Sequence, residues 1–244
     1  MKRRVFLFAG LASGLAALGG GLLFSHRDRL APLLNPLVLK LRGRRTVADV
    51  MDSLGDEALA RVQPDFSRVG LSLSMLAELR FIGLKQEKKL EMWARADDSA
   101  WHRIKTYPIL AASGGPGPKL REGDRQVPEG LYEIEYLNPN SAYHLSLKLN
   151  YPNQNDRVQA TLDGRTNLGG DIMIHGKSAS VGCLAIGDPA IEEVFALVAR
   201  LGRSRVSALI VPTDLRLYQA QDEREWVQTL YDQLSLEIAP FAEG

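Results

Sequence analysis

The chain has 244 residues, of which 45% are hydrophobic and 24% charged, and this is enough to bury a sizeable core. Its 30 basic and 29 acidic residues leave a formal net charge of +1, so the composition argues against a protein that binds nucleic acid through its overall charge. The single cysteine excludes an intramolecular disulfide bond.

Residues 1–28 have the pattern of a signal peptide or a membrane anchor. Three basic residues precede an uncharged run, residues 5–24, that is long enough to cross a bilayer but contains five glycines. Small residues at Ala17 and Gly19 suit signal-peptidase cleavage, and the paired arginines resemble a twin-arginine signal, so cleavage and export route stay open. Either way we expect a periplasmic protein whose N-terminus contacts the cytoplasmic membrane, with anchoring by residues 5–24 as the second alternative.

Residues 29–76 are expected to form a linker followed by a helical segment. From Thr46 onward, apolar residues recur at spacings of three and four, which is typical of an amphipathic helix. Thr46 and Asp49 have the spacing of an N-terminal cap, Gly55 is a candidate break, and Pro64 is expected to end the helix.

Residues 77–218 are expected to form a β-rich domain, because the periodicity changes toward two after Leu79. The predicted strands are LRFIGLK, KLEMWAR, HRIKTYPIL, GLYEIEYL, YHLSLKLN and DIMIH, the first two forming a hairpin. A long glycine- and proline-rich loop, residues 111–130, separates the third from the fourth, and loops of this length are usually functional or mobile.

The last part of the domain is expected to contain a helix and a returning strand. The helix begins with Asp188 as its cap and Pro189 in its first turn, and it ends near Gly202. The strand VSALIV follows, and residues 219–244 contain a terminal helix from Glu223 to Leu236. The predicted fold class is therefore mainly β with flanking helices, preceded by a short helical segment and an N-terminal membrane or signal helix.

The segment from Asp171 to Asp188 has the residues that a cysteine acyltransferase needs. A cysteine with an ordinary pKa is mostly protonated at neutral pH, so Cys183 as a nucleophile would need a base, and a small-residue turn brings His175 back toward it. Gly182 lets neighbouring backbone amides converge on an oxyanion, and Ser180 could orient the base or the acceptor. A backbone carbonyl or Asp171 could orient the imidazole.

A structural interpretation of the same residues is equally good on spacing alone. Isolated cysteines are often buried, and a histidine at a strand end is often a hydrogen-bonded structural residue. One cysteine and scattered histidines supply no recognisable set of metal ligands, so we expect no metal and no cofactor.

The segment IHGKSASVGCLAI resembles the active-site signature of the L,D-transpeptidase family, the YkuD-type catalytic domain. It is closest to the YafK-like murein L,D-transpeptidase/amidase branch, in which a non-histidine residue, here Val181, precedes the Gly-Cys pair. REGDRQVPEGLYEI, LNPNS and LNYPNQNDR also resemble that branch, so the resemblance covers roughly Leu79 to Arg216.

The resemblance implies a β-rich domain in which the cysteine attacks the carbonyl of the meso-diaminopimelate residue in a peptidoglycan stem peptide. It assigns Cys183 as nucleophile, His175 as general base and acid, and Ser180 as a support. The amides of Gly182 and Cys183 become the oxyanion donors.

Polar residues of the other motifs are candidates for substrate binding: Asn150, Tyr151, Asn153 and Arg157. Arg157 could hold a carboxylate through two hydrogen bonds, whereas Tyr151 could stack on a sugar. For the asparagines a role in turn formation is the better interpretation, because both lie in turn-forming sequences.

The expected partners are therefore peptidoglycan stem peptides and, as an alternative, a peptidoglycan-linked lipoprotein. An amine acceptor from another stem gives a cross-link, and a lysine of the lipoprotein gives its attachment. A water acceptor makes the chain an amidase that detaches such a lipoprotein, an activity that the branch includes. A catalytically silent wall-binding domain is the third alternative.

Overall fold

The structure is a computed structural model that describes residues 31–97 and 99–242. The predicted signal or anchor in residues 1–28 lies outside the described residues. Within the described ranges, none of the helices combines the length and the apolar character that crossing a bilayer requires.

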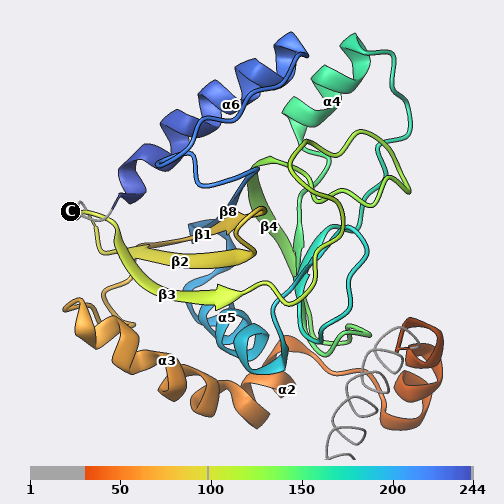
Figure 1. Ribbon diagram of the computed structural model, residues 1–244. Helices are drawn as coiled ribbons and strands as arrows, with labels where there is room; N and C mark the ends of the chain where they lie inside the picture. Colours follow the sequence, from red (N-terminus) through yellow and green to blue (C-terminus); the bar gives the residue numbers. More distant parts are fainter. Residues whose placement is uncertain (1–30, 98, 243–244) are drawn as a thin grey trace, which may run out of the picture.

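A curled eight-stranded sheet forms the centre of the fold (Figure 1). Its strand order is β3-β2-β1-β8-β4-β5-β6-β7, and neighbours are antiparallel except for the parallel pairs β1–β8 and β6–β7. The strands are β1 (Glu78–Leu84), β2 (Lys89–Arg95), β3 (His102–Pro108), β4 (Gly130–Asn138), β5 (Ser146–Leu149), β6 (Met173–His175), β7 (Leu184–Ala185) and β8 (Val206–Val211). The β-rich fold class and the β1–β2 hairpin are thus confirmed.

Helices cover both faces of the sheet (Figure 1). They are α2 (Val47–Val50), α3 (Asp56–Arg68), α4 (Gln154–Leu162), α5 (Asp188–Leu201) and α6 (Glu225–Ile238), with shorter turns at Met51–Gly55, Arg203–Arg205 and Ala239–Phe241. α3 packs against α5, whose apolar side joins the main core. α6 closes a second cluster on the opposite face, where Trp93 and Phe241 meet edge to face with 5.5 Å between ring centroids.

The predicted helical segment forms, but its ends differ from the prediction. Thr46 and Asp49 make the expected reciprocal cap of α2. Gly55 does not split the segment, because residues Met51–Gly55 form a π-helical turn that connects α2 to α3. Pro64 does not end it either and lies inside α3, since buried Val62 and Phe66 anchor the helix on both sides of the proline.

Two further corrections concern helix starts. Asp188 is the first residue of α5 rather than its cap, a position that Gly187 takes, and the Asp188 carboxylate instead accepts hydrogen bonds from the amide and ammonium of Lys177. The turn-like sequence around Asn153 begins a helix, α4, which was not predicted; Asn153 and Asp156 form its capping box.

Candidate active site

The segment from His175 to Cys183 connects two adjacent parallel strands, β6 and β7. In their register Ile174 lies opposite Leu184 and His175 lies opposite Ala185, and Cys183 is the residue directly before β7. His175 is the last residue of β6 and Cys183 precedes the first residue of β7, so the two residues lie on adjacent chain segments. The pairing of β6 with β7 therefore places the two predicted catalytic residues on neighbouring segments at one edge of the sheet.

His175 is fixed in one tautomer. Its Nδ1 lies 2.6 Å from the carbonyl oxygen of Gly176, and because a carbonyl only accepts, Nδ1 carries the proton and Nε2 is left as an acceptor. Tyr143 stacks on the imidazole with 4.5 Å between ring centroids. Burial lowers the pKa of His175 below its usual value, and the bond to Gly176 opposes this effect. The ring is therefore a neutral base at neutral pH.

Cys183 is partly buried and protonated at neutral pH. Its Sγ lies 3.5 Å from the carbonyl oxygen of Asp171, the acceptor of the thiol hydrogen. Burial raises the pKa of the Cys183 thiol to about 11, and the backbone of Met173 acts in the opposite direction. The resting site thus contains a thiol and a neutral imidazole rather than a thiolate–imidazolium pair.

Ser180 closes the turn that carries Cys183. Its Oγ accepts a hydrogen bond from the Cys183 amide at 3.0 Å and donates to the Cys183 carbonyl at 2.7 Å. At the other side of the turn, Lys177 is bound to Asp188 at the start of α5. The segment before the nucleophile is therefore held by its own side chains and by α5.

A serine that the sequence analysis did not single out reaches the predicted oxyanion site. Ser113, from the long loop, accepts a hydrogen bond from the Gly182 amide at 2.6 Å and donates to the Arg125 carbonyl at 2.7 Å. Gly182 has a φ of 84°, which favours glycine. In the free protein both predicted oxyanion amides therefore have serine hydroxyls as acceptors.

The loop that presents Ser113 is held at its base by a buried ion pair. Lys85 Nζ donates to the carbonyls of Gly117 and Val127, one on each limb of the loop, and to Glu129 Oε1 at 2.9 Å. Glu129 Oε1 also accepts from the Gly117 amide. The loop predicted to be functional or mobile is thus anchored by specific contacts, and it places a hydroxyl on the nucleophile's turn.

A cavity of about 460 Å³ lies beside the carbonyl that holds the thiol. Lys148 spans it, with Nζ 3.2 Å from Asp171 and 3.5 Å from Glu135. Asp171 has a left-handed backbone, φ 54°, which is strained for a residue other than glycine and is often found at functional sites. The wall also includes Asn150, Tyr151 and Arg157, so three of the four predicted substrate-binding residues line this cavity.

Most of these predicted residues also have local structural partners. Asn150 accepts a hydrogen bond from the Glu133 amide, and Asn153 caps α4. Tyr151 is buried and donates to the Leu168 carbonyl, whereas Arg157 is exposed. Of the four, Arg157 has the side chain that is most accessible to a ligand.

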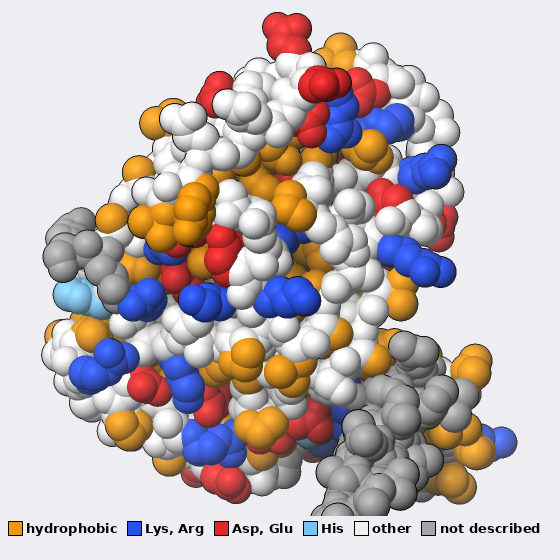
Figure 2. Space-filling model, in the orientation of Figure 1, with side chains coloured by type: hydrophobic (Ala, Val, Ile, Leu, Met, Phe, Trp, Pro, Cys, Tyr) orange, Lys and Arg blue, Asp and Glu red, His pale blue; other side chains and the backbone are white. Residues whose placement is uncertain are grey.

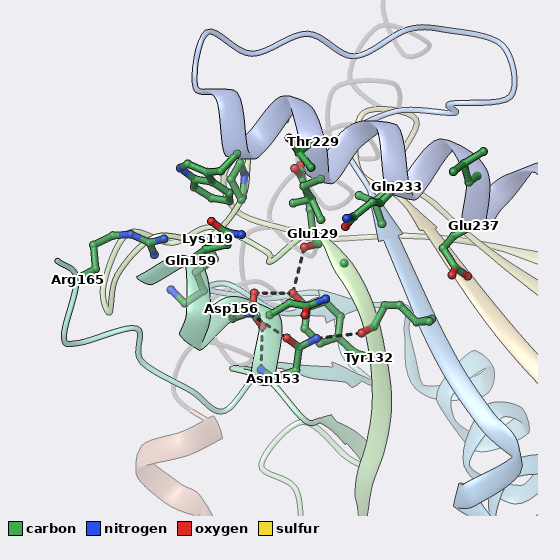
Figure 3. A pocket seen from close by; sticks show the side chains of 18 residues that line it. Lys119, Glu129, Tyr132, Asn153, Asp156, Gln159, Arg165, Thr229, Gln233 and Glu237 are labelled. Carbon is green, nitrogen blue, oxygen red and sulfur yellow. Dashed lines mark hydrogen bonds between the residues drawn. The ribbon is translucent and has the colours of Figure 1, made fainter. Parts of the chain in front are cut away.

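A second cavity, of about 400 Å³, lies between β4, α4 and α6 (Figure 3). Its lining is largely apolar, and Figure 2 shows apolar side chains gathered in a hollow below α6. Asn153 and Asp156 line it, and burial raises the pKa of Asp156 to about 6. Cys183 and His175 are not among the lining residues of either cavity; the first cavity includes Asp171, whose carbonyl oxygen lies 3.5 Å from Cys183 Sγ.

Metal ions in proteins are bound by sets of histidine, cysteine and acidic side chains. Across residues 31–97 and 99–242, no group of three or more histidine, cysteine or acidic side chains is placed to hold a metal ion.

The sequence matches known proteins over the part that contains this site. Residues 85–211 match the family described as the L,D-transpeptidase catalytic domain (YkuD). Two curated Escherichia coli proteins, from strains K12 and O157:H7, both named "Putative L,D-transpeptidase YafK", are 32% identical over 133 residues. The match covers 52% of this chain and 51% of theirs, so the chain spans about half the length of the curated relatives it matches.

Two solved structures are similar to part of the chain. The helical cell shape determining protein Pgp2 from Campylobacter jejuni is 23% identical, with a TM-score of 0.46 over 72% of this chain and 62% of that one. Bd1075 from Bdellovibrio bacteriovorus is 19% identical, with a TM-score of 0.43 over 68% and 57% of the two chains.

Proposed function

The chain belongs to the L,D-transpeptidase catalytic-domain (YkuD) family, and on this basis we propose that it is a cysteine acyltransferase acting on peptidoglycan stem peptides in the periplasm. The observation that carries the proposal is the pairing of β6 with β7, which places His175 and Cys183 on adjacent chain segments. The Gly176 carbonyl fixes the imidazole tautomer whose Nε2 can take a proton.

The reaction follows from these groups in two steps. The Cys183 thiol gives its proton to His175 Nε2 as the sulfur attacks the peptide carbonyl of the meso-diaminopimelate residue. The carbon–nitrogen bond breaks, His175 returns the proton to the leaving amine, and a thioester remains. In the second step an amine or water attacks the thioester as His175 Nε2 takes its proton; the carbon–sulfur bond breaks, and His175 returns the proton to the Cys183 sulfur.

The acceptor defines the product, and a muropeptide assay separates the alternatives. The full chain is incubated with tetrapeptide muropeptides and, separately, with muropeptides that carry a lysine-linked lipoprotein peptide. Release of D-alanine with formation of a cross-linked dimer would identify a transpeptidase, and release of the lysine peptide with water as acceptor would identify an amidase. Unchanged muropeptides in both reactions, from folded protein, would contradict the proposed substrate class.

The pH dependence of Cys183 alkylation is expected to differ from that of acyl transfer. Because the pKa of the thiol is about 11, the iodoacetamide reaction should accelerate about tenfold per pH unit between pH 7 and 10. Acyl transfer should instead decline only as pH falls through the lowered pKa of His175, below 6.5, where the base becomes protonated. Alkylation that reaches its plateau below pH 7 would mean that a thiolate–imidazolium pair forms in the free protein.

Replacing Ser113 with alanine is expected to accelerate acylation of Cys183. The Gly182 amide donates to the Ser113 hydroxyl, and it cannot donate equally well to the carbonyl oxygen of an incoming substrate at the same time. Ser180 holds the turn by its own two hydrogen bonds, so the turn does not need Ser113. A hydrogen bond with a net value of about 1 kcal/mol corresponds to a roughly fivefold increase in the acylation rate. The rate of acylation by a p-nitrophenyl ester measures it, with Ser113→Thr as the control that keeps the hydroxyl. A slower S113A variant would show that Ser113 positions the amide instead.

Replacing Arg157 with alanine is expected to raise KM while leaving kcat nearly unchanged. The guanidinium is exposed at the cavity beside Asp171, where it can hold a substrate carboxylate in the ground state and the transition state alike. A lost charged hydrogen bond corresponds to a roughly 10- to 100-fold increase in KM. Arg200→Ala, an exposed arginine near the end of α5, is the matched control. If the two substitutions changed KM equally, Arg157 would not be a substrate-binding residue.

A further inference from the structure

Residues 31–42 are helical, and a hydrogen bond joins them to the catalytic domain. The half-buried residues are Ala31, Asn35 and Leu39, spaced by four, which is the spacing of one helix face. Asn35 Nδ2 donates to the carbonyl of Asn140, in the turn between β4 and β5, at 3.1 Å. We refer to residues 31–42 as the N-terminal helix.

The same turn also holds the chain just after this helix. The Arg45 amide donates to Asn140 Oδ1 and Asn140 Nδ2 donates to the Arg45 carbonyl, both at 2.8 Å, and Arg45 Nη2 donates to the Pro139 carbonyl at 2.9 Å. Contacts on both sides of Gly43 therefore fix the direction in which the N-terminal helix points relative to the catalytic domain.

The opposite side of the N-terminal helix exposes a continuous apolar face. Leu33, Leu37 and Leu41 stand one above the other with exposed fractions of 76%, 57% and 78%, and Leu34 and Val38 extend the face beside them. In Figure 2 apolar side chains are visible on the outer side of this helix, at the lower right. Apolar side chains clustered in this way on a surface are typical of an interaction site.

Every charged side chain in residues 31–45 is basic. Lys40, Arg42, Arg44 and Arg45 lie within six residues, and residues 31–45 contain no acidic side chain. An apolar helix face bordered by basic side chains is complementary to a bilayer that carries anionic headgroups, since leucines enter the acyl-chain boundary and cations pair with phosphates.

We propose that the N-terminal helix lies in the surface of an anionic bilayer and, through the Asn140 contacts, sets the orientation of the catalytic domain on that surface. The helix follows residues 5–24, whose uncharged sequence is itself expected at a membrane. This inference is independent of the acyltransferase activity, because neither Cys183 nor His175 takes part in it.

The test uses the full chain, labelled at one introduced cysteine. Cys183→Ala removes the native thiol, and Leu37→Cys or Leu236→Cys then receives an environment-sensitive fluorophore; Leu236 is an exposed apolar residue on α6. The protein is reconstituted into phosphatidylglycerol–phosphatidylcholine vesicles that contain lipids brominated on the acyl chains. We expect a blue shift and at least twofold quenching at position 37, with neither at position 236.

A charge variant separates the electrostatic contribution of the basic residues from the apolar contribution of the leucines. Replacing Lys40, Arg42 and Arg44 with glutamine is expected to reduce quenching at position 37 at least twofold in the same vesicles, with position 236 unchanged. Emission at position 37 that matches position 236 would overturn the proposal. A blue shift without lipid quenching would also overturn it, because the face would then be covered by protein, either residues 1–30 or a second copy.

Discussion

Replacing Cys183 with alanine is expected to reduce product formation on the order of 10⁴-fold or more, to the level of the uncatalysed background. The substitution removes the sulfur that would form the acyl intermediate, and losing a nucleophile has effects of this size in other acyl-transfer enzymes. The side chain is small and partly buried, so alanine fits its place in the turn that Ser180 closes. Chromatography of muropeptide products measures the effect.

A matched variant separates loss of chemistry from loss of the fold. Cys183→Ser keeps a hydrogen-bond donor for the Asp171 carbonyl but has a far weaker nucleophile under these conditions, so we expect a similar loss. Both variants should unfold within about 2 °C of the parent in thermal denaturation. Product formation by folded C183A at more than a few per cent of the parent rate would contradict the assignment of Cys183 as the nucleophile.

Replacing His175 with asparagine is expected to slow acyl transfer about 10²- to 10⁴-fold, which is the usual contribution of a general base. The asparagine amide can donate to the Gly176 carbonyl as Nδ1 does, but nothing then takes the proton of a thiol whose pKa is about 11. Residual activity should rise with pH up to about 11, because hydroxide then supplies the thiolate.

Two controls test whether the loss of acyl transfer in H175N comes from the missing base. Alkylation of Cys183 by iodoacetamide at pH 10 should change less than threefold in H175N, since that reaction needs no imidazole at that pH. His102→Asn, on β3 at the other edge of the sheet, should leave acyl transfer unchanged. If H175N retained the parent's rate at neutral pH, another group would have to be the base.

The positions of Cys183 and His175 on neighbouring segments could be predicted from one continuous stretch, because a strand, a short turn and a second strand return the chain alongside itself. The sequence also limited the partner of the imidazole to two candidates, a backbone carbonyl or Asp171. The Gly176 carbonyl has this role in the structure, and the Asp171 side chain binds Lys148 instead.

Residues that reach the site from distant segments could not be predicted in the same way. Ser113 is 69 positions from Gly182, and its contact depends on how Lys85 and Glu129 hold the loop, which no local pattern encodes. Lys148 had a usable signal, because alternation along YHLSLKLN places it on the same face as Ser146, which pairs with His175.

The missed helix α4 and the mistaken helix end at Pro64 have different causes. For α4, turn-forming residues obscured a capping box at Asn153 and Asp156 whose spacing of three is visible in the sequence. For Pro64, the local preference to end a helix was overcome by burial of Val62 and Phe66, and this tertiary effect has no sequence signature.

Intact-mass analysis of the full chain during turnover tests the central claim most directly. After rapid mixing with tetrapeptide muropeptides and acid quenching, we expect a transient mass increase equal to the acyl part of the substrate, located on Cys183 by peptide mapping and absent from C183A. Product formation without any adduct on Cys183, at time points that resolve single turnovers, would contradict acyl transfer through this cysteine.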